Sequence, residues 1–200
     1  MPLGKQAKVL TKAQVDRVFR HVDSTRYPVR NRAILVLSVK AGLRAKEIAS
    51  VTWDMVSDAN GNVGTAIHLT NAASKGRSGR IIPMNGDLRS ALVDLTALRT
   101  ARDEARRVIV SERGRQTSPQ VIVNLFFRWY RDVGFRGCSS HSGRRTFITN
   151  AARKISSVGG SLRDVQALAG HANLGTTQAY IDVDGEAQRY SMLKMSQGHG

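Results

Sequence analysis

Cysteine is nearly absent from this chain, and its scarcity excludes two classes of protein. Cys138 is the only cysteine among 200 residues. A single thiol cannot build a disulfide framework or a thiolate metal cluster within one chain. A reducing cytoplasm is the setting that this composition favours. Cys138 lies shortly before His141, but we interpret it as a buried or incidental thiol rather than as a nucleophile.

Long hydrophobic runs are also missing. The longest apolar stretch, residues 33–39, is interrupted by Ser38, whereas a membrane span requires about 20 apolar residues. The basic residues near the N-terminus are not followed by an apolar stretch. We therefore predict neither a signal peptide nor a membrane segment.

Acidic residues are few, and the charge balance that results predicts a polyanionic partner. There are 15 Asp and Glu against 31 Lys and Arg, which gives a formal net charge of +16. The basic clusters recur from end to end, as in a protein that wraps its ligand. Charge alone does not separate DNA from RNA. The length fits one domain with a proper core.

Hydrophobic spacing and capping residues predict a mainly α-helical protein with a small antiparallel β-hairpin. Thr11 suits an N-cap, and residues 33–39 read as a buried helical segment. We expect strands over 63–69 and 80–83, joined by a polar loop, and helices over about 11–22, 28–39, 45–51, 87–104, 118–133, 142–154, 161–169 and 176–181.

Four short motifs bring cations, imidazoles and one tyrosine into a fixed order. They are AGLRAKEIA with Arg44, ASKGRSGRIIP with Lys75, HSGRRT with His141 and Arg144, and LAGHANLGTTQAYI with His171 and Tyr180. Two arginines can hold the non-bridging oxygens of a phosphate, a lysine can protonate a leaving alkoxide, and a tyrosine can attack phosphorus. The set suits phosphodiester chemistry without a metal.

In order and spacing these motifs resemble the catalytic domain of the tyrosine recombinases, the phage-integrase family of site-specific DNA recombinases. The resemblance covers residues 11 to about 190. It implies that the two arginines bind the scissile phosphate, that Glu47 orients the first of them, and that Tyr180 is the nucleophile. It further implies His141 as the base, Lys75 as the general acid and a hydrogen bond from His171.

Further basic residues are candidates for contact with DNA, and for Arg145 a solvated position is the alternative. Arg77 competes with Lys75 for the role of acid, but a guanidinium stays protonated at neutral pH and suits a phosphate contact better. We expect Arg77, Arg80 and Arg145 to bind DNA. The chain departs from the family at Gly143, where a leucine is usual.

The domain organisation follows from the extent of the resemblance. We expect a flexible segment over residues 1–10, a catalytic domain over 11–190 and a tail over 181–200 that packs on a neighbouring protomer or on its own core. We expect no N-terminal core-binding domain of the kind that is common in the family. A natural single-domain recombinase and an excised fragment both remain open.

The resemblance implies a recombinase that cleaves and rejoins DNA through a 3′-phosphotyrosyl intermediate. Its expected partners are double-stranded DNA and three further copies in a homotetramer on paired sites, and DNA-bending accessory factors are a further candidate. No cofactor, metal or membrane is expected, and the expected setting is cytoplasmic and DNA-associated, for a protein of bacterial, archaeal or phage origin. Two alternatives remain: a type IB topoisomerase-like strand transferase, and a catalytically silent DNA-binding regulator.

Overall fold

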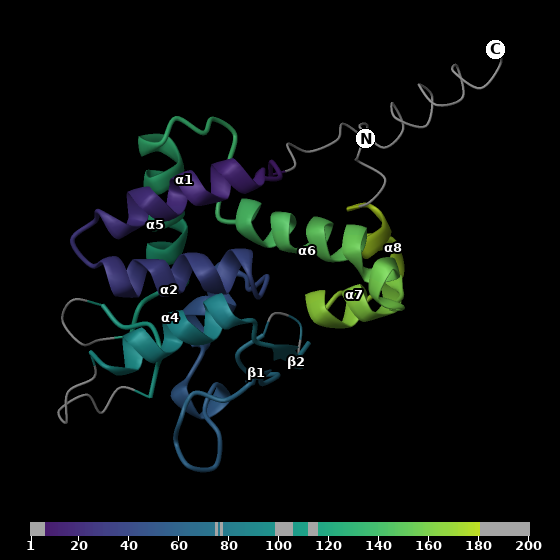
Figure 1. The fold of residues 1–200 in the computed structure, drawn as a ribbon, viewed down its shortest axis with the longest axis horizontal. Helices are drawn as coiled ribbons and strands as arrows, with labels where there is room; N and C mark the ends of the chain where they lie inside the picture. Colours follow the sequence, from purple (N-terminus) through teal and green to yellow (C-terminus); the bar gives the residue numbers. More distant parts are fainter. Residues whose placement is uncertain (1–6, 75, 77, 99–105, 112–115, 181–200) are drawn as a thin grey trace. The chain divides into compact units, whose positions relative to one another are not determined.

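The computed structural model describes residues 7–74, 76, 78–98, 106–111 and 116–180. The chain divides into two compact units, residues 1–147 and 148–200, and the boundary falls within helix α6 (Ser142–Lys154). The described part is mainly helical and carries one two-stranded antiparallel sheet, so the predicted fold class is confirmed (Figure 1).

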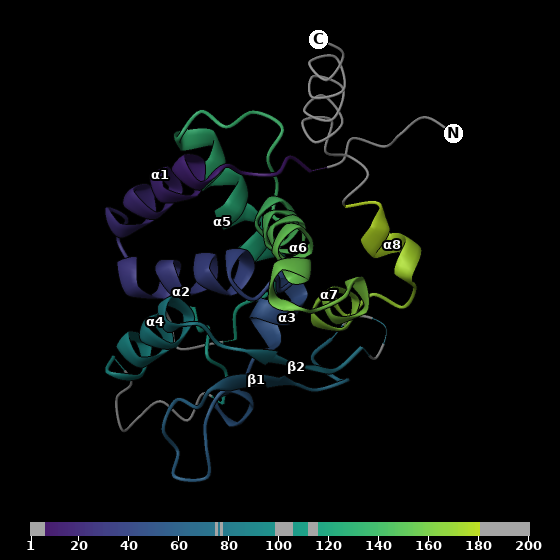
Figure 2. The ribbon, with the colours of Figure 1, turned by 45° about the vertical axis from the view of Figure 1, so that its right-hand side comes forward.

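Helix α2 is the centre of the first unit. Its range, Pro28–Val39, agrees with the prediction, and residues 33–39 are all buried. It packs between α1 (Lys12–Asp23) and α4 (Gly86–Thr96), as Figures 1 and 2 show. Thr11 caps α1 as predicted: its hydroxyl accepts from the backbone N–H of Gln14, whose side chain accepts from the backbone N–H of Thr11.

The hairpin consists of β1 (Ala66–Leu69) and β2 (Arg80–Pro83), with Leu69 opposite Arg80. Ile67 and Ile82 face each other and are buried, so one face of the sheet closes the core. The strand predicted from residue 63 starts later, because Val63 forms only an isolated bridge with Ser57. Residues 70–79 connect the strands.

Two further helices of this unit pack on each other. Helix α5 (Pro119–Asp132) begins after the Ser118 cap and packs on α1 and on α3 (Ala45–Ser50). The helix predicted to reach residue 104 ends at Thr96, and Leu98, which continues the leucine spacing, is 60% exposed. Residues 99–105 lie outside the described part. The short 3-10 segment η1 (Trp53–Met55) was not predicted.

The second unit contains the end of α6, the 3-10 segment η2 (Ile155–Val158), α7 (Leu162–Ala169) and α8 (Leu174–Gln178). Gly170 ends α7 in a left-handed conformation, φ 60°. Helix α8 starts earlier than predicted because the side chain of Asn173 accepts from the backbone N–H of Thr176. α7 and α8 pack on each other.

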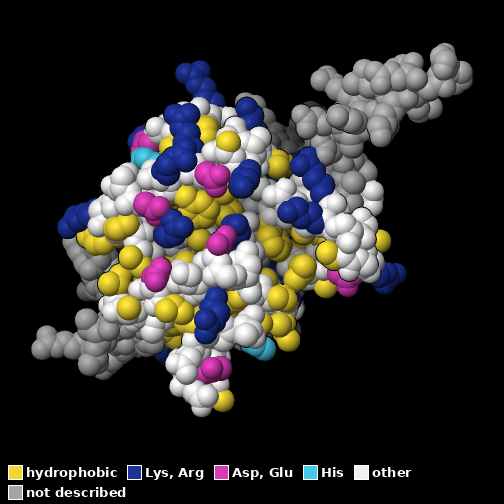
Figure 3. All heavy atoms as spheres, viewed as in Figure 1, with side chains coloured by type: hydrophobic (Ala, Val, Ile, Leu, Met, Phe, Trp, Pro, Cys, Tyr) yellow, Lys and Arg dark blue, Asp and Glu magenta, His cyan; other side chains and the backbone are white. Residues whose placement is uncertain are grey.

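Basic side chains are dispersed over the face of the molecule shown in Figure 3. On the face shown in Figure 3, Lys and Arg are scattered among apolar and neutral side chains, and Asp and Glu are fewer. Within the described residues, no helix combines the length and apolarity needed to cross a bilayer.

Candidate active site

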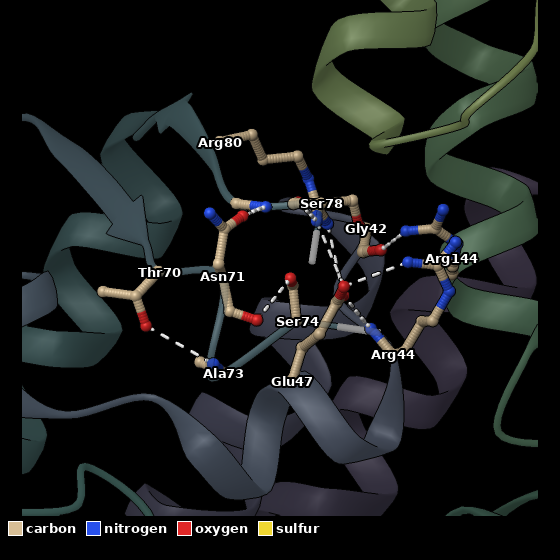
Figure 4. A network of polar contacts seen from close by, with 11 residues as sticks. Gly42, Arg44, Glu47, Thr70, Asn71, Ala73, Ser74, Ser78, Arg80 and Arg144 are labelled. Carbon is tan, nitrogen blue, oxygen red and sulfur yellow. Dashed lines mark hydrogen bonds and ion pairs between the residues drawn. The ribbon is translucent and has the colours of Figure 1, made fainter. Parts of the chain in front are cut away.

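The first functional contact lies at the start of α3. Arg44 immediately precedes this helix, and Glu47 lies in its first turn. The Glu47 carboxylate accepts from the backbone N–H of Arg44 at 2.8 Å and from Nη1 of the same residue at 3.0 Å (Figure 4). The predicted Arg44–Glu47 contact is therefore present. The Glu47 side chain is fully buried, whereas 21% of the Arg44 side chain stays exposed.

A second arginine shares this carboxylate. Arg80, the first residue of β2, donates from Nη1 to Oε1 of Glu47 at 3.1 Å and from Nη2 to Oε2 at 3.2 Å. Burial by itself would raise the pKa of Glu47, but hydrogen bonds and positive charge from Arg80, and then from Arg44, lower the pKa below its ordinary value. Glu47 is thus held as a carboxylate.

Arg80, which the sequence analysis expects to bind DNA, is directed to Glu47 in the structure. Only 6% of its side chain is exposed, and both terminal nitrogens bond to Glu47. Its place as the first residue of the returning strand was readable in the sequence. Its partner was not, because Glu47 lies 33 residues away along the chain.

Arg144 is held by the loop that precedes α3. Its Nη1 donates to the carbonyl oxygen of Gly42 at 2.6 Å, and the residue is 3% exposed (Figure 4). Gly42 has φ +65°, and a Cβ at this position would overlap the ring of Phe147. Glycine is therefore required both by the backbone and by the packing. The structure thus brings Arg144 to the same short segment that carries Arg44.

His141 lies just before α6 and is exposed. Its backbone N–H donates to the hydroxyl of Ser139 at 3.3 Å, and its carbonyl accepts from the N–H of Arg145. His141 and Arg144 are therefore separated by the predicted helical turn. Arg145 is partly exposed, as a residue that contacts DNA would need to be.

Cys138 is partly buried. Burial raises the pKa of its thiol, against a weaker opposing effect of a hydrogen bond with Ser142 and the charge of Lys8. Thiolate is therefore scarce at neutral pH, which agrees with the interpretation of Cys138 as an incidental thiol.

The loop between the strands carries two of the predicted site residues. Lys75 and Arg77 both lie outside the described residues. Around them, the Asn71 side chain accepts from the N–H of Gly79 at 2.9 Å, and the Ser74 hydroxyl donates to the Asn71 carbonyl at 3.0 Å (Figure 4). Asn71 thus joins the two sides of the loop, a role that the sequence analysis missed.

The second unit brings His171 and Tyr180 together. Their ring centroids lie 5.5 Å apart in a stacked arrangement, and Tyr180 is half-buried. His171 Nδ1 lies 2.9 Å from the hydroxyl oxygen of Thr177, which is fully buried. This contact fixes the orientation of the imidazole and gives Thr177 a role that the sequence analysis did not assign. The signal available was the threonine pair between the histidine and the tyrosine.

Known proteins resemble the chain over most of its length. The tyrosine recombinase XerC of Pseudomonas savastanoi pv. phaseolicola is 32% identical over 159 residues, which are 78% of this chain and 48% of that protein. XerC of Haemophilus influenzae is 30% identical over 188 residues, 90% of this chain and 59% of that protein. The chain therefore spans about half the length of the curated relatives it matches.

Solved structures share the fold at lower sequence identity. The crystal structure of XerA recombinase aligns with a TM-score of 0.75 at 23% identity, over 94% of this chain and 64% of that chain. XerH site-specific recombinase bound to palindromic difH substrate aligns with a TM-score of 0.73 at 20% identity, over 92% and 51%. Residues 8–187 match the phage integrase family, and on this match the chain belongs to that family of tyrosine recombinases.

Proposed function

We propose that this chain acts as a site-specific DNA recombinase of the integrase or invertase type, which cleaves and rejoins DNA through a 3′-phosphotyrosyl intermediate. The observation that carries the proposal is the pair Arg44 and Arg144. One is anchored to Glu47 and the other to the carbonyl of Gly42, two residues before Arg44. Two guanidinium groups that are both held by residues 42–47 can together bind the non-bridging oxygens of a phosphate. Relatives named tyrosine recombinase support the same activity.

Cleavage begins with attack by the tyrosine. The Oη atom of Tyr180 forms a bond to the scissile phosphorus, and its proton passes to His141 as general base. Arg44 and Arg144 stabilise the negative charge that grows on the non-bridging oxygens as phosphorus becomes pentacoordinate. His171 adds a hydrogen bond, with its ring held by Thr177.

The bond from phosphorus to the 5′-oxygen then breaks. Lys75 gives a proton to this leaving oxygen, so the products are a 5′-hydroxyl and a 3′-phosphotyrosyl link. The energy of the phosphodiester is retained in that link. The 5′-hydroxyl of a second duplex can therefore reverse the step and join the strands without a nucleotide cofactor.

Double-stranded DNA is the proposed partner, and the Tn1549 transposon integrase, which shares the fold, has been solved in complex with a circular intermediate DNA. We assign the catalytic domain to residues 11–190, with Arg77 and Arg145 on the DNA backbone. Exchange between two duplexes requires four active sites, so the proposed assembly is a homotetramer on paired sites, to which the tail over residues 181–200 and DNA-bending factors contribute. The proposed setting is the cytoplasm, where bacterial, archaeal or phage DNA lies.

Trapping on nicked duplexes tests the proposal. A nick near the cleavage point lets the short 5′-hydroxyl fragment diffuse away, so the covalent protein–DNA adduct accumulates and its DNA can be sequenced. The wild-type protein should form this adduct, and Tyr180→Phe should bind the same DNA without forming it. An adduct in Tyr180→Phe would assign the nucleophile elsewhere. Relaxation of supercoiled plasmid with no preferred sequence would favour the topoisomerase-like alternative.

A bridging-sulfur substrate tests the role of Lys75. Lys75→Ala should slow cleavage by about 10² to 10⁴, the range for one general acid. A thiolate leaves without being protonated, so sulfur at the 5′-bridging position should largely remove the defect. Without such rescue, Lys75 is not the acid, and Arg77 and His141 become the candidates.

A further inference from the structure

Arg80 takes no part in the mechanism above, although both of its terminal nitrogens bond to Glu47. It approaches in parallel, one terminal nitrogen to each carboxylate oxygen, at 3.1 and 3.2 Å. This fork-to-fork arrangement fixes the plane of the carboxylate as well as its charge. A single hydrogen bond would leave the carboxylate free to turn about its last side-chain bond.

The orientation of that carboxylate in turn sets the position of Arg44. Oε1 of Glu47 receives both Arg80 Nη1 and Arg44 Nη1, the latter at 3.0 Å. Oε2 receives Arg80 Nη2 and the backbone N–H of Arg44. Each oxygen of Glu47 is therefore shared between the two arginines, and rotation of the carboxylate would move the acceptor on which the Arg44 guanidinium rests.

Arg44 and Arg80 differ in the exposed fraction of their side chains, and this difference suits them to different roles. The Arg44 side chain is 21% exposed and that of Arg80 is 6% exposed, around one fully buried carboxylate. A phosphate can therefore reach Arg44, while little of the Arg80 side chain is accessible. Arg80 also comes from the base of the hairpin loop, since it pairs with Leu69 where that loop begins and ends.

We infer that Arg80 is a positioning residue: it locks the Glu47 carboxylate in the orientation that holds Arg44 against the scissile phosphate, and it does not bind DNA itself. This inference rests on the proposed function. It replaces the DNA contact expected for Arg80 from the sequence. It predicts that substitution of Arg80 slows cleavage mainly where the non-bridging oxygens of the scissile phosphate carry negative charge.

A charge-neutral substrate isolates that defect. In a methylphosphonate, a methyl group replaces one non-bridging oxygen and the negative charge is lost, so a well-placed guanidinium matters less. The DNA sequence identified by the trapping experiment is synthesised as a nicked duplex, with either a phosphodiester or a methylphosphonate at the scissile position. Covalent adduct formation is then timed for wild type, Arg80→Met, Arg80→Lys and the control Arg32→Met, whose ion pair with Asp23 is on the surface.

Arg80→Met should form adduct about 10²-fold more slowly than wild type on the phosphodiester, as expected for misplacement of a reacting group. On the methylphosphonate it should approach the wild-type rate. Arg80→Lys keeps the charge and the fold but cannot make the fork, so it should show the same selective defect in smaller measure. Arg32→Met should match wild type on both substrates.

Three outcomes would overturn the inference. Equal slowing on both substrates by Arg80→Lys, with wild-type thermal stability, would mean that Arg80 acts through DNA binding. Wild-type rates for both Arg80 variants would mean that it has no part in cleavage. Adduct formation by wild type separates these cases from failure of the proposed function, because a wild-type protein that forms no adduct on any nicked duplex refutes the recombinase activity and this inference with it.

Discussion

Nη1 of Arg144 lies 2.6 Å from the carbonyl oxygen of Gly42, so one arginine of the candidate site is held by the backbone next to the other. The conformation of Gly42 therefore matters to both. Its φ of +65° is left-handed, and the ring of Phe147 leaves no space for a Cβ. Changes at this glycine should affect stability and cleavage together.

Gly42→Ala should lower the free energy of unfolding by about 2 to 5 kcal/mol, the sum of left-handed strain and overpacking. Gly61→Ala is the matched control, because Gly61 has φ +79° with nothing within 4 Å of a Cβ. It should lose only about 1 to 2 kcal/mol. Urea unfolding measures both variants, and equal losses would show that the Phe147 contact is not limiting.

The lowered pKa of Glu47 predicts acid sensitivity. The charged form is favoured in the folded state, so its stabilising contribution is complete above the ordinary pKa of 4.5 and is lost as pH falls through the lower folded value. Urea unfolding across this acid range should show a loss of stability that Glu47→Gln no longer shows. At neutral pH, Glu47→Gln should cost about 3 kcal/mol or more, since it leaves buried arginine charge without its carboxylate.

Asp87 supplies the control for this experiment. Its pKa is also lowered, chiefly by a hydrogen bond and charge from Lys40, but 65% of its side chain is exposed. Solvent screens such a pair, so Asp87→Asn should cost about 1 kcal/mol or less. A pH profile of Glu47→Gln that still follows wild type would assign the acid loss to other carboxylates.

The departure from the usual leucine at position 143 has a packing reason that can be measured. A Cβ at Gly143 would overlap the hydroxyl of Ser38 and come within 3.0 Å of Val39 Cγ1. Gly143→Ala should therefore cost about 1 to 3 kcal/mol. Ser38→Ala should be neutral or stabilising, because the buried Ser38 hydroxyl has no hydrogen-bond partner within the described structure.

The double variant Ser38→Ala/Gly143→Ala measures the energetic coupling between the two positions. With the hydroxyl removed, Gly143→Ala should cost less, with a coupling of about 0.5 to 3 kcal/mol in urea unfolding. Strict additivity of the two substitutions would mean that the Ser38 hydroxyl does not limit the approach of α6 to α2.

Thr177 gives a prediction that concerns catalysis. Thr177→Val keeps the buried shape but removes the hydroxyl next to His171 Nδ1. Adduct formation on the nicked duplex should fall by about 5- to 10-fold, the kinetic equivalent of one hydrogen bond. Thr176→Val is the control, because Thr176 is exposed and it is its backbone N–H that bonds to Asn173. Equal rates for both variants would remove Thr177 from the site.

Local signals in the sequence were sufficient for most of the fold. Thr11 and Ser118 marked helix starts because a capping hydroxyl acts within a few residues of itself. The leucine spacing after residue 87 failed at its end, since Leu98 repeats the pattern but is 60% exposed. A periodic pattern indicates which residues can face a core, but it does not indicate where the core ends.

The candidate site was predictable where its contacts are local or its motifs are ordered. Arg44 and Glu47 are three residues apart, and their contact followed from helical geometry. The bond from Arg80 to Glu47 spans 33 residues and that from Arg144 to Gly42 spans 102. Neither contact produces a periodic pattern in the sequence, so both could be identified only in the structure.

Helix α8, which ends just before Tyr180, has only five residues. A helix of this length cannot sustain itself, because nucleation costs more than so few backbone bonds return. The amide protons of this segment should therefore exchange with solvent much sooner than those of α2, whose central residues are buried. The proposed nucleophile thus directly follows a helix whose backbone hydrogen bonds should open far more often than those of α2.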